Sequence, residues 1–131
     1  MTEFVIVMHD GRQVVTSGVD LKNVAAVYNQ RQSIAAVIGK KSMTKGLVAA
    51  VAKLEALTQT EERNTTIQVG QTLLYTSAKS ETFLETLTND INNKDFALVN
   101  DEILISRSFY SHAELKENTI TANEDKTQAE A

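Results

Sequence analysis

Residues 33–57 read SIAAVIGKKSMTKGLVAAVAKLEAL, and this stretch contains the longest predicted helix of the chain. The uninterrupted apolar run at 34–38 is typical of a strand that is covered on both faces. Gly39 ends this run, and a turn with cations and hydroxyls follows it. From about residue 43, apolar side chains recur at helical spacing: Leu47, Ala50, Val51, Leu54 and Leu57. The stretch therefore predicts a buried strand, a basic turn and an amphipathic helix over residues 43–57.

The composition is that of one globular domain. The chain has 131 residues, of which 42% are apolar and 23% are charged. Because it has no cysteine, disulfides and thiolate metal sites are excluded. No stretch approaches the roughly 20 apolar residues of a membrane-spanning helix, and residues 1–11 lack the pattern of a signal peptide. We therefore expect a cytoplasmic protein that does not contact membranes.

The formal charge of −4 is distributed unevenly along the chain. Residues 1–60 carry seven cations and four acids, whereas residues 61–131 carry six cations and thirteen acids. The two parts thus have formal charges of +3 and −7. Such a split is typical either of a basic binding face with an acidic tail or of ordinary surface charge.

The first third of the chain predicts a hairpin and one ambiguous element. Apolar strands on either side of Asp10-Gly11 indicate a β-hairpin over residues 3–17, closed by a type I′ turn. Residues 20–32 favour a helix with Asp20 as its N-cap. The alternative is a strand over residues 24–28 that pairs with residues 34–38, and the sequence leaves both open.

The second half predicts further strands, one more hairpin and a helix. A strand is expected at 65–69, followed by a bulge or a tight turn at Gly70-Gln71 and by a further extended stretch at 72–76. Strands at 96–99 and 103–106 around residues 100–102 indicate the second hairpin. A helix over residues 80–92 would be capped by Ser80. The whole order predicts an α+β (or α/β) fold over residues 1–112, a single layered domain with two to three helices packed on a mixed β-sheet and hairpins near both ends. Residues 113–131 read as an acidic, flexible C-terminal tail.

The candidate binding site is the basic turn. Its residues are Lys40, Lys41, Ser42, Thr44 and Lys45. At the start of the expected helix, free backbone N–H groups and the helix dipole would favour a phosphate there. A P-loop is excluded, because the glycine that this motif requires five residues before Gly39 is replaced by Ile34. The other reading is an ordinary solvated helix start.

Each of the remaining polar clusters can be interpreted either as a functional site or as an ordinary structural feature. Asp10, next to His9 at a strand end, suits a metal ligand or base, but also a turn residue that tolerates positive φ. Phe109 and Tyr110, near Arg107, suit base stacking or core packing. Two distant histidines without cysteine do not make a zinc site. We identify no catalytic residue, no metal ligand set and no cofactor site.

These observations lead to one hypothesis and two alternatives. We expect a small non-enzymatic binding or regulatory protein, of the accessory kind found in bacteria or mobile elements. It would contact nucleic acid, or a partner that processes nucleic acid, through residues 40–45, with the acidic tail competing for that surface. The first alternative is a protein-interaction module, as a homodimer or an adaptor.

The second alternative is a metal-dependent hydrolase with a degenerate ribonuclease H-like arrangement. If residues 24–38 form a hairpin, the order of strands and helices resembles that of ribonuclease H-like folds, and Asp10 matches the aspartate that ends their first strand. The resemblance also implies an acid early in the first long helix and another after the next strand, and neither stands here. Asp10 would then need a carboxylate brought to it by folding, from among Asp90, Asp95, Asp101 and Glu102.

Overall fold

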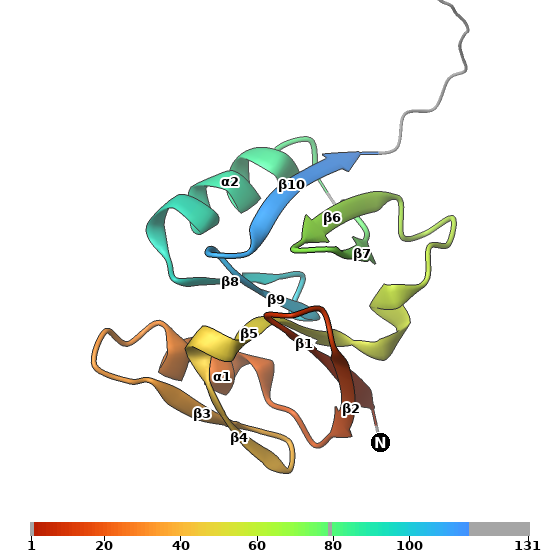
Figure 1. Cartoon of the computed structure of the whole chain (residues 1–131). Helices are drawn as coiled ribbons and strands as arrows, with labels where there is room; N and C mark the ends of the chain where they lie inside the picture. The colour runs from red at the N-terminus through yellow and green to blue at the C-terminus, as the bar shows by residue number, and fades with distance from the viewer. Residues whose placement is uncertain (1, 79, 116–131) are drawn as a thin grey trace, which may run out of the picture.

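The computed structural model describes residues 2–78 and 80–115, and this part of the chain has an α+β fold (Figure 1). It contains ten strands in three antiparallel sheets and two α-helices. The strands are β1 (Glu3–Met8), β2 (Gln13–Ser17), β3 (Ala35–Ile38), β4 (Lys41–Thr44), β5 (Val48–Lys53), β6 (Thr65–Val69), β7 (Thr72–Thr76), β8 (Phe96–Val99), β9 (Ile103–Ser106) and β10 (Tyr110–Leu115). The helices are α1 (Leu21–Tyr28) and α2 (Phe83–Asn93), with single 3₁₀ turns at Lys45–Leu47 and Leu54–Leu57.

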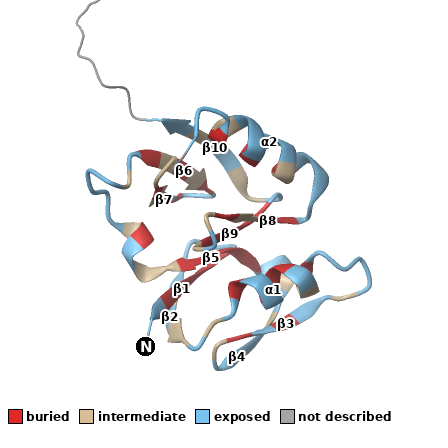
Figure 2. Cartoon of the chain, turned by 180° about the vertical axis from the view of Figure 1, so that it is seen from behind, coloured by how far each residue is buried: buried red, intermediate tan, exposed pale blue. Residues whose placement is uncertain are grey.

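A five-stranded sheet of order β2-β1-β5-β9-β8 forms the middle of the molecule. β5 is its central strand and is buried along both faces, because Ala50 and Ala52 point into one core and Val51 into the other. Figure 2 shows this burial as red on β1, β5 and β9. The sheet therefore separates two apolar cores.

The first core lies between the five-stranded sheet, the three-stranded sheet β10-β6-β7 and α2. Helix α2 contributes Phe83, Leu87 and Ile91, three residues on one helical stripe. Beside this core, the carboxylate of Glu102 accepts two hydrogen bonds from the Arg63 guanidinium (2.8 and 3.1 Å) and one from the Thr76 hydroxyl (2.6 Å). This network ties the β6 and β7 layer to the turn between β8 and β9.

The second core lies on the opposite face, under α1 and the β3–β4 hairpin. Tyr28 is fully buried there, and its hydroxyl donates to the Met43 carbonyl oxygen (2.8 Å). Burial raises the pKa of Tyr28 to about 12. The side-chain amide of Asn29 exchanges two hydrogen bonds with the backbone of Phe96 (3.0 and 2.8 Å), so it pairs with the open edge of β8 much as a strand would.

Several predictions from the sequence are confirmed. The β1–β2 and β8–β9 hairpins occupy the expected residues. The extended stretches expected at 65–69 and 72–76 also form, and they pair with each other, so Gly70-Gln71 is a tight turn and not a bulge. Residues 21–28 are helical rather than extended, and Asp20 caps this helix by accepting a hydrogen bond from the Asn23 N–H (3.2 Å). Both helices pack on the five-stranded sheet, one on each face.

The predicted helix over residues 43–57 is wrong. This stretch forms the end of β4, two 3₁₀ turns and the central strand β5. The alanines that suggested a helix are the small side chains that let a strand be covered closely on both faces. Every strand pairing in residues 2–78 and 80–115 is antiparallel, so the expectation of a mixed sheet is also wrong, and the fold is α+β rather than α/β.

Smaller corrections concern the strand at 34–38, two turns and a cap. β3 is covered on one face only, because the side chain of Val37 is 65% exposed. Gly11 has positive φ (91°) and Asp10 does not, so the first turn is not type I′, whereas Asn100 and Asp101 both have positive φ (51° and 54°). α2 begins at Phe83, and Ser80 does not cap it.

The boundaries of the expected tail also change. β10 runs to Leu115 and pairs with β6, so residues 113–115 of the expected tail belong to a strand. Residues 116–131 lie outside the described residues. Among those described, no helix has the length and apolar character needed to cross a membrane.

Candidate functional site

Four of the five residues of the predicted basic turn lie in the β3–β4 hairpin, Lys45 begins the 3₁₀ turn that follows β4, and none lies at the N-terminus of an α-helix. Gly39 and Lys40 form the two-residue connection, and Gly39 has the positive φ (61°) that the first position of a type II′ turn requires. A Cβ at Gly39 would lie 2.6 Å from the Ser17 carbonyl oxygen, so the turn is pressed against the end of β2. The helix dipole and free N–H groups that we expected are therefore absent here.

Lys40 and Lys41 are both exposed at this hairpin tip. With Glu3, Val15, Thr16 and Ser17 they line a hollow of about 580 Å³ beside the end of β2. Glu3 is the one acidic residue that lines it, and it forms no ion pair with either lysine within the described residues. The two ammonium groups are thus available to an external anion.

Ser42 and Thr44 lie on the outward face of the hairpin. The register pairs Val37 with Ser42 and Ala35 with Thr44, and cross-strand partners share a face. All four side chains are exposed. Neither hydroxyl forms a hydrogen bond within residues 2–78 and 80–115. Lys41 pairs with Ile38 on the other face of the hairpin, so these hydroxyls and the lysines do not converge on one point.

Lys45 has a structural role that separates it from the other four. Its ammonium donates to the carbonyl oxygens of Tyr28 (3.3 Å) and Gln30 (3.5 Å) and lies 3.8 Å from the Asp95 carboxylate. Its side chain is only 22% exposed. A cation at the C-terminal end of α1 stabilises the last carbonyl groups of that helix. Lys45 is therefore engaged inside the molecule.

Two further exposed cations, Lys22 and Arg31, lie on the elements next to this hairpin, and sequence reasoning missed them. Lys22 lies in the first turn of α1, and Arg31 lies in the loop that leads into β3. Both are exposed, and neither forms an ion pair with another described residue. We call Lys22, Arg31, Lys40 and Lys41 the basic surface.

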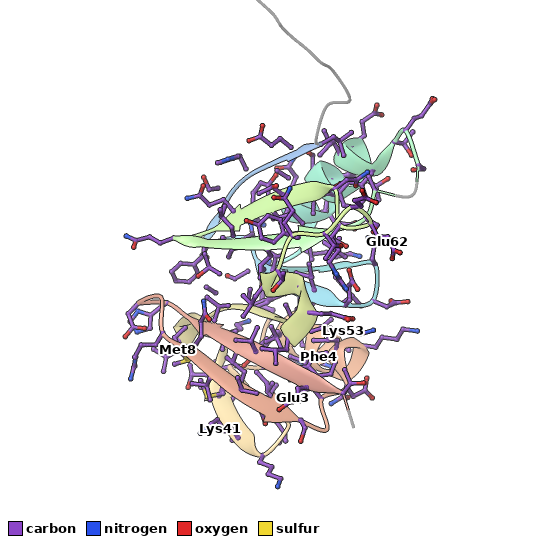
Figure 3. The ribbon with its side chains drawn as sticks, turned by 90° about the vertical axis from the view of Figure 1, so that its right-hand side faces the viewer. Glu3, Phe4, Met8, Lys41, Lys53 and Glu62 are labelled. Carbon is purple, nitrogen blue, oxygen red and sulfur yellow. The ribbon has the colours of Figure 1, made fainter. Side chains whose placement is uncertain are left out.

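A charge count over residues 18–47 would have revealed this surface. The segment holds five cations and a single acid, Asp20, and so has a formal charge of +4. The carboxylate of Asp20 is committed to capping α1. On the other side of the five-stranded sheet, residues 54–94 hold three cations and six acids. Figure 3 shows Lys41 near the bottom of the molecule and Glu62 in its upper half. The basic and the acidic parts of the sequence thus lie on opposite sides of the five-stranded sheet.

The Asp10 carboxylate stabilises the turn between β1 and β2 by hydrogen bonds within that turn. It accepts hydrogen bonds from the backbone N–H (3.1 Å) and the side-chain Nε (2.8 Å) of Arg12. The backbone hydrogen bond from Arg12, helped by the nearby guanidinium, lowers the pKa of Asp10. The turn reading of Asp10 therefore accounts for its contacts. His9 and Asp10 also line a hollow of about 280 Å³ between the β1–β2 and β6–β7 turns.

Folding does not gather the carboxylates that the hydrolase alternative needs. Within the described residues, no three His, Asp or Glu side chains lie close enough to hold a metal ion. Burial raises the pKa of Glu102, but the hydrogen bonds from Arg63 and Thr76 outweigh it and leave the pKa below its usual value. The ribonuclease H-like resemblance also loses its first long helix, because residues 43–57 contain β5.

Phe109 and Tyr110 pack against the first core, as their structural reading expected. Both are half-buried, and burial raises the pKa of Tyr110. They lie around the start of β10, whereas the basic surface lies on α1 and the β3–β4 hairpin. The aromatic rings and the basic surface are therefore separate features.

The chain matches no protein-family model, and no curated protein or solved structure is significantly similar to it.

Proposed function

We propose that this protein is a non-enzymatic binding protein that contacts nucleic acid through the basic surface. The observation that supports this proposal most is the excess of unpaired positive charge on one layer. Four exposed cations lie on residues 18–47, and the single acid of this segment is held as a helix cap. Such a layer attracts a polyanion, and the acidic layer on the far side would orient the approach.

Binding through the basic surface should depend on salt concentration in a predictable way. Each phosphate that a cation neutralises releases condensed counterions, so the logarithm of the affinity falls with the logarithm of salt concentration by about 0.9 per contact on duplex DNA. Four cations would give a slope of about −3.6. A binding site of this kind is weak at physiological salt and clear at low salt.

The test is fluorescence anisotropy with labelled single-stranded and double-stranded nucleic acid at several salt concentrations. The Lys40→Ala/Lys41→Ala variant should bind more weakly, with a slope about 2 units shallower on duplex DNA. The matched control is Lys53→Ala/Lys94→Ala, which removes the same charge from outside residues 18–47. Equal losses in both variants would show that only net charge matters and would contradict the proposal, as would an absence of binding at low salt.

The acidic C-terminal residues extend the proposal. Residues 116–131 carry two cations and four acids. If they compete with nucleic acid for the basic surface, deleting residues 116–131 should tighten binding at low salt and have less effect at high salt. The deletion spares β10, which ends at Leu115. Unchanged affinity at low salt would count against competition.

A second candidate function is self-association or adaptor binding through the open edge of the five-stranded sheet. Within the described residues, β2 pairs only with β1. The hydrogen bond from the Met8 N–H to the Arg12 carbonyl oxygen (2.7 Å) shows which β2 residues bond to β1 and which do not. Gln13 and Val15 therefore direct their backbone groups outward, and the Val15 side chain is 51% exposed. Sedimentation at several concentrations would reveal such a dimer, and Val15→Lys should abolish it. Cytoplasmic location stays a prediction from the sequence.

A further inference from the structure

The outward face of the β3–β4 hairpin has the size and the side chains of an element that enters a DNA groove. Its four exposed residues are Ala35, Val37, Ser42 and Thr44. Two methyl-bearing side chains thus stand opposite two hydroxyl groups. Hydroxyls can donate to or accept from base edges, and small apolar side chains can contact the methyl group of thymine. No carboxylate on this face would repel phosphates.

The hairpin also has the right dimensions. Each strand has four residues, which span about 13 Å at roughly 3.3 Å per residue, and paired strands lie about 4.8 Å apart. The major groove of B-form DNA is about 12 Å wide and admits a two-stranded ribbon, whereas the minor groove is only about 6 Å wide.

The inner face, the base and the tip of the ribbon are all fixed by contacts with the rest of the protein. Ala36 and Ile38 are buried in the second core. At the base of the ribbon, the Lys45 N–H donates to the Ile34 carbonyl oxygen (2.7 Å). At its tip, the Gly39 turn contacts β2. The outward face is therefore presented in one fixed orientation, while Figures 1 and 2 show the hairpin standing at the rim of the molecule with much of its surface exposed.

Cations stand at both ends of this ribbon. Lys40 and Lys41 lie at the tip, and Arg31 precedes β3 at the base. With the strands running along the groove, cations at the two ends of the ribbon can reach the phosphates that flank it. A second copy of the chain is a poor occupant, because a symmetric contact would bring two layers of formal charge +4 together.

We propose that the β3–β4 ribbon binds in the major groove of double-stranded DNA, with Val37, Ser42 and Thr44 against the base edges and the cations on the phosphates. This inference rests on the proposed contact with nucleic acid. It adds a choice of substrate, because the major groove of A-form double-stranded RNA is too deep and narrow for such an element.

The experiment compares the full chain with two variants that make the same chemical change. Val37→Glu places an acid on the outward face, and Leu73→Glu places one on β7, where Leu73 is 43% exposed. Anisotropy is measured with duplex DNA, duplex RNA of the same sequence and single-stranded DNA, each at low and physiological salt. Because both substituted side chains are exposed, both variants are expected to fold, which circular dichroism checks.

The inference predicts at least tenfold tighter binding to duplex DNA than to duplex RNA, and at least a tenfold loss for Val37→Glu but not for Leu73→Glu. Methyl green, which occupies the major groove, should compete with the protein, and netropsin, which occupies the minor groove, should not. Equal binding to both duplexes, equal losses in the two variants or competition by netropsin alone would overturn the groove inference and leave the proposed function standing. No binding to any of the three nucleic acids at low salt would overturn both.

Discussion

Replacing Lys45 by methionine separates the structural cation of the hairpin region from the exposed ones. The substitution keeps the aliphatic stem and removes the ammonium, which donates to the Tyr28 carbonyl at 3.3 Å and to the Gln30 carbonyl at 3.5 Å. The second distance is at the limit of a hydrogen bond, so we count one charged bond, worth roughly 1.5–3 kcal/mol in a buried setting. With the side chain 22% exposed, the expected loss of unfolding free energy is about 1–2 kcal/mol.

The assay is urea denaturation followed by circular dichroism, with binding to nucleic acid measured in parallel. A loss of 1–2 kcal/mol lowers the unfolding midpoint by roughly 0.5–1 M urea and the melting temperature by roughly 4–8 °C. Lys40→Met is the control, because Lys40 is exposed at the hairpin tip. Lys40→Met should change the unfolding free energy by less than about 0.5 kcal/mol and weaken binding to nucleic acid. Lys45→Met should lower the unfolding free energy and leave binding largely unchanged. Wild-type stability in Lys45→Met, together with a binding loss as large as that of Lys40→Met, would refute this division of roles.

Three further substitutions test the packing that supports the site. Glu102→Gln should lower the unfolding free energy by about 2 kcal/mol at pH 7, because Glu102 and Arg63 are both about 15% exposed and the substitution leaves Arg63 with only the exposed carboxylate of Glu55 as a partner. The pKa of Glu102 is lower in the folded state than in the unfolded state, so the stability that Glu102 contributes is present above the unfolded pKa and is lost as pH falls through the folded pKa. The difference in unfolding free energy between pH 7 and pH 3 should therefore be smaller in the variant than in the wild type. Asn29→Ala removes two hydrogen bonds from the backbone of Phe96 and should cost about 1–3 kcal/mol and promote association through the uncovered edge of β8, measured by denaturation and by light scattering. Gly39→Ala puts a methyl group against the backbone of β2 at positive φ and should cost about 2 kcal/mol, so an unchanged melting temperature would show that the tip is not pressed there.

Much of the fold could be predicted because its signals are local. Turn residues between two apolar runs indicated both of the predicted hairpins, and the Asp20 cap favoured the helix over the strand for residues 21–28. These elements depend on a few neighbouring residues, whose preferences agree with the final structure.

The central strand could not be predicted because its surroundings are not local. β5 is buried on both faces, so its residues show no alternation of polar and apolar side chains, and its alanines have a high intrinsic preference for helix. Tertiary packing overrides that preference. The preceding Gly39-Lys40 connection carried the missing signal, since a glycine at the first position of a two-residue loop indicates a hairpin.

The candidate site was predicted in part. Lys40 and Lys41 are exposed, and Ser42 and Thr44 share an outward face, although the local structure is a strand and not a helix start. Lys45 could not be assigned its structural role from sequence, because its partners come from the end of α1 and from the residue before β8.

The most direct test of the account is an NMR titration of the ¹⁵N-labelled full chain with a short DNA duplex at low salt. The account predicts that the backbone amide signals of Lys22, Arg31 and residues 35–44 move first, while those of residues 54–94 stay in place. It predicts that added salt reverses these shifts. No shifts at low salt, or shifts confined to residues 54–94, would contradict the assignment of the basic surface as the binding site.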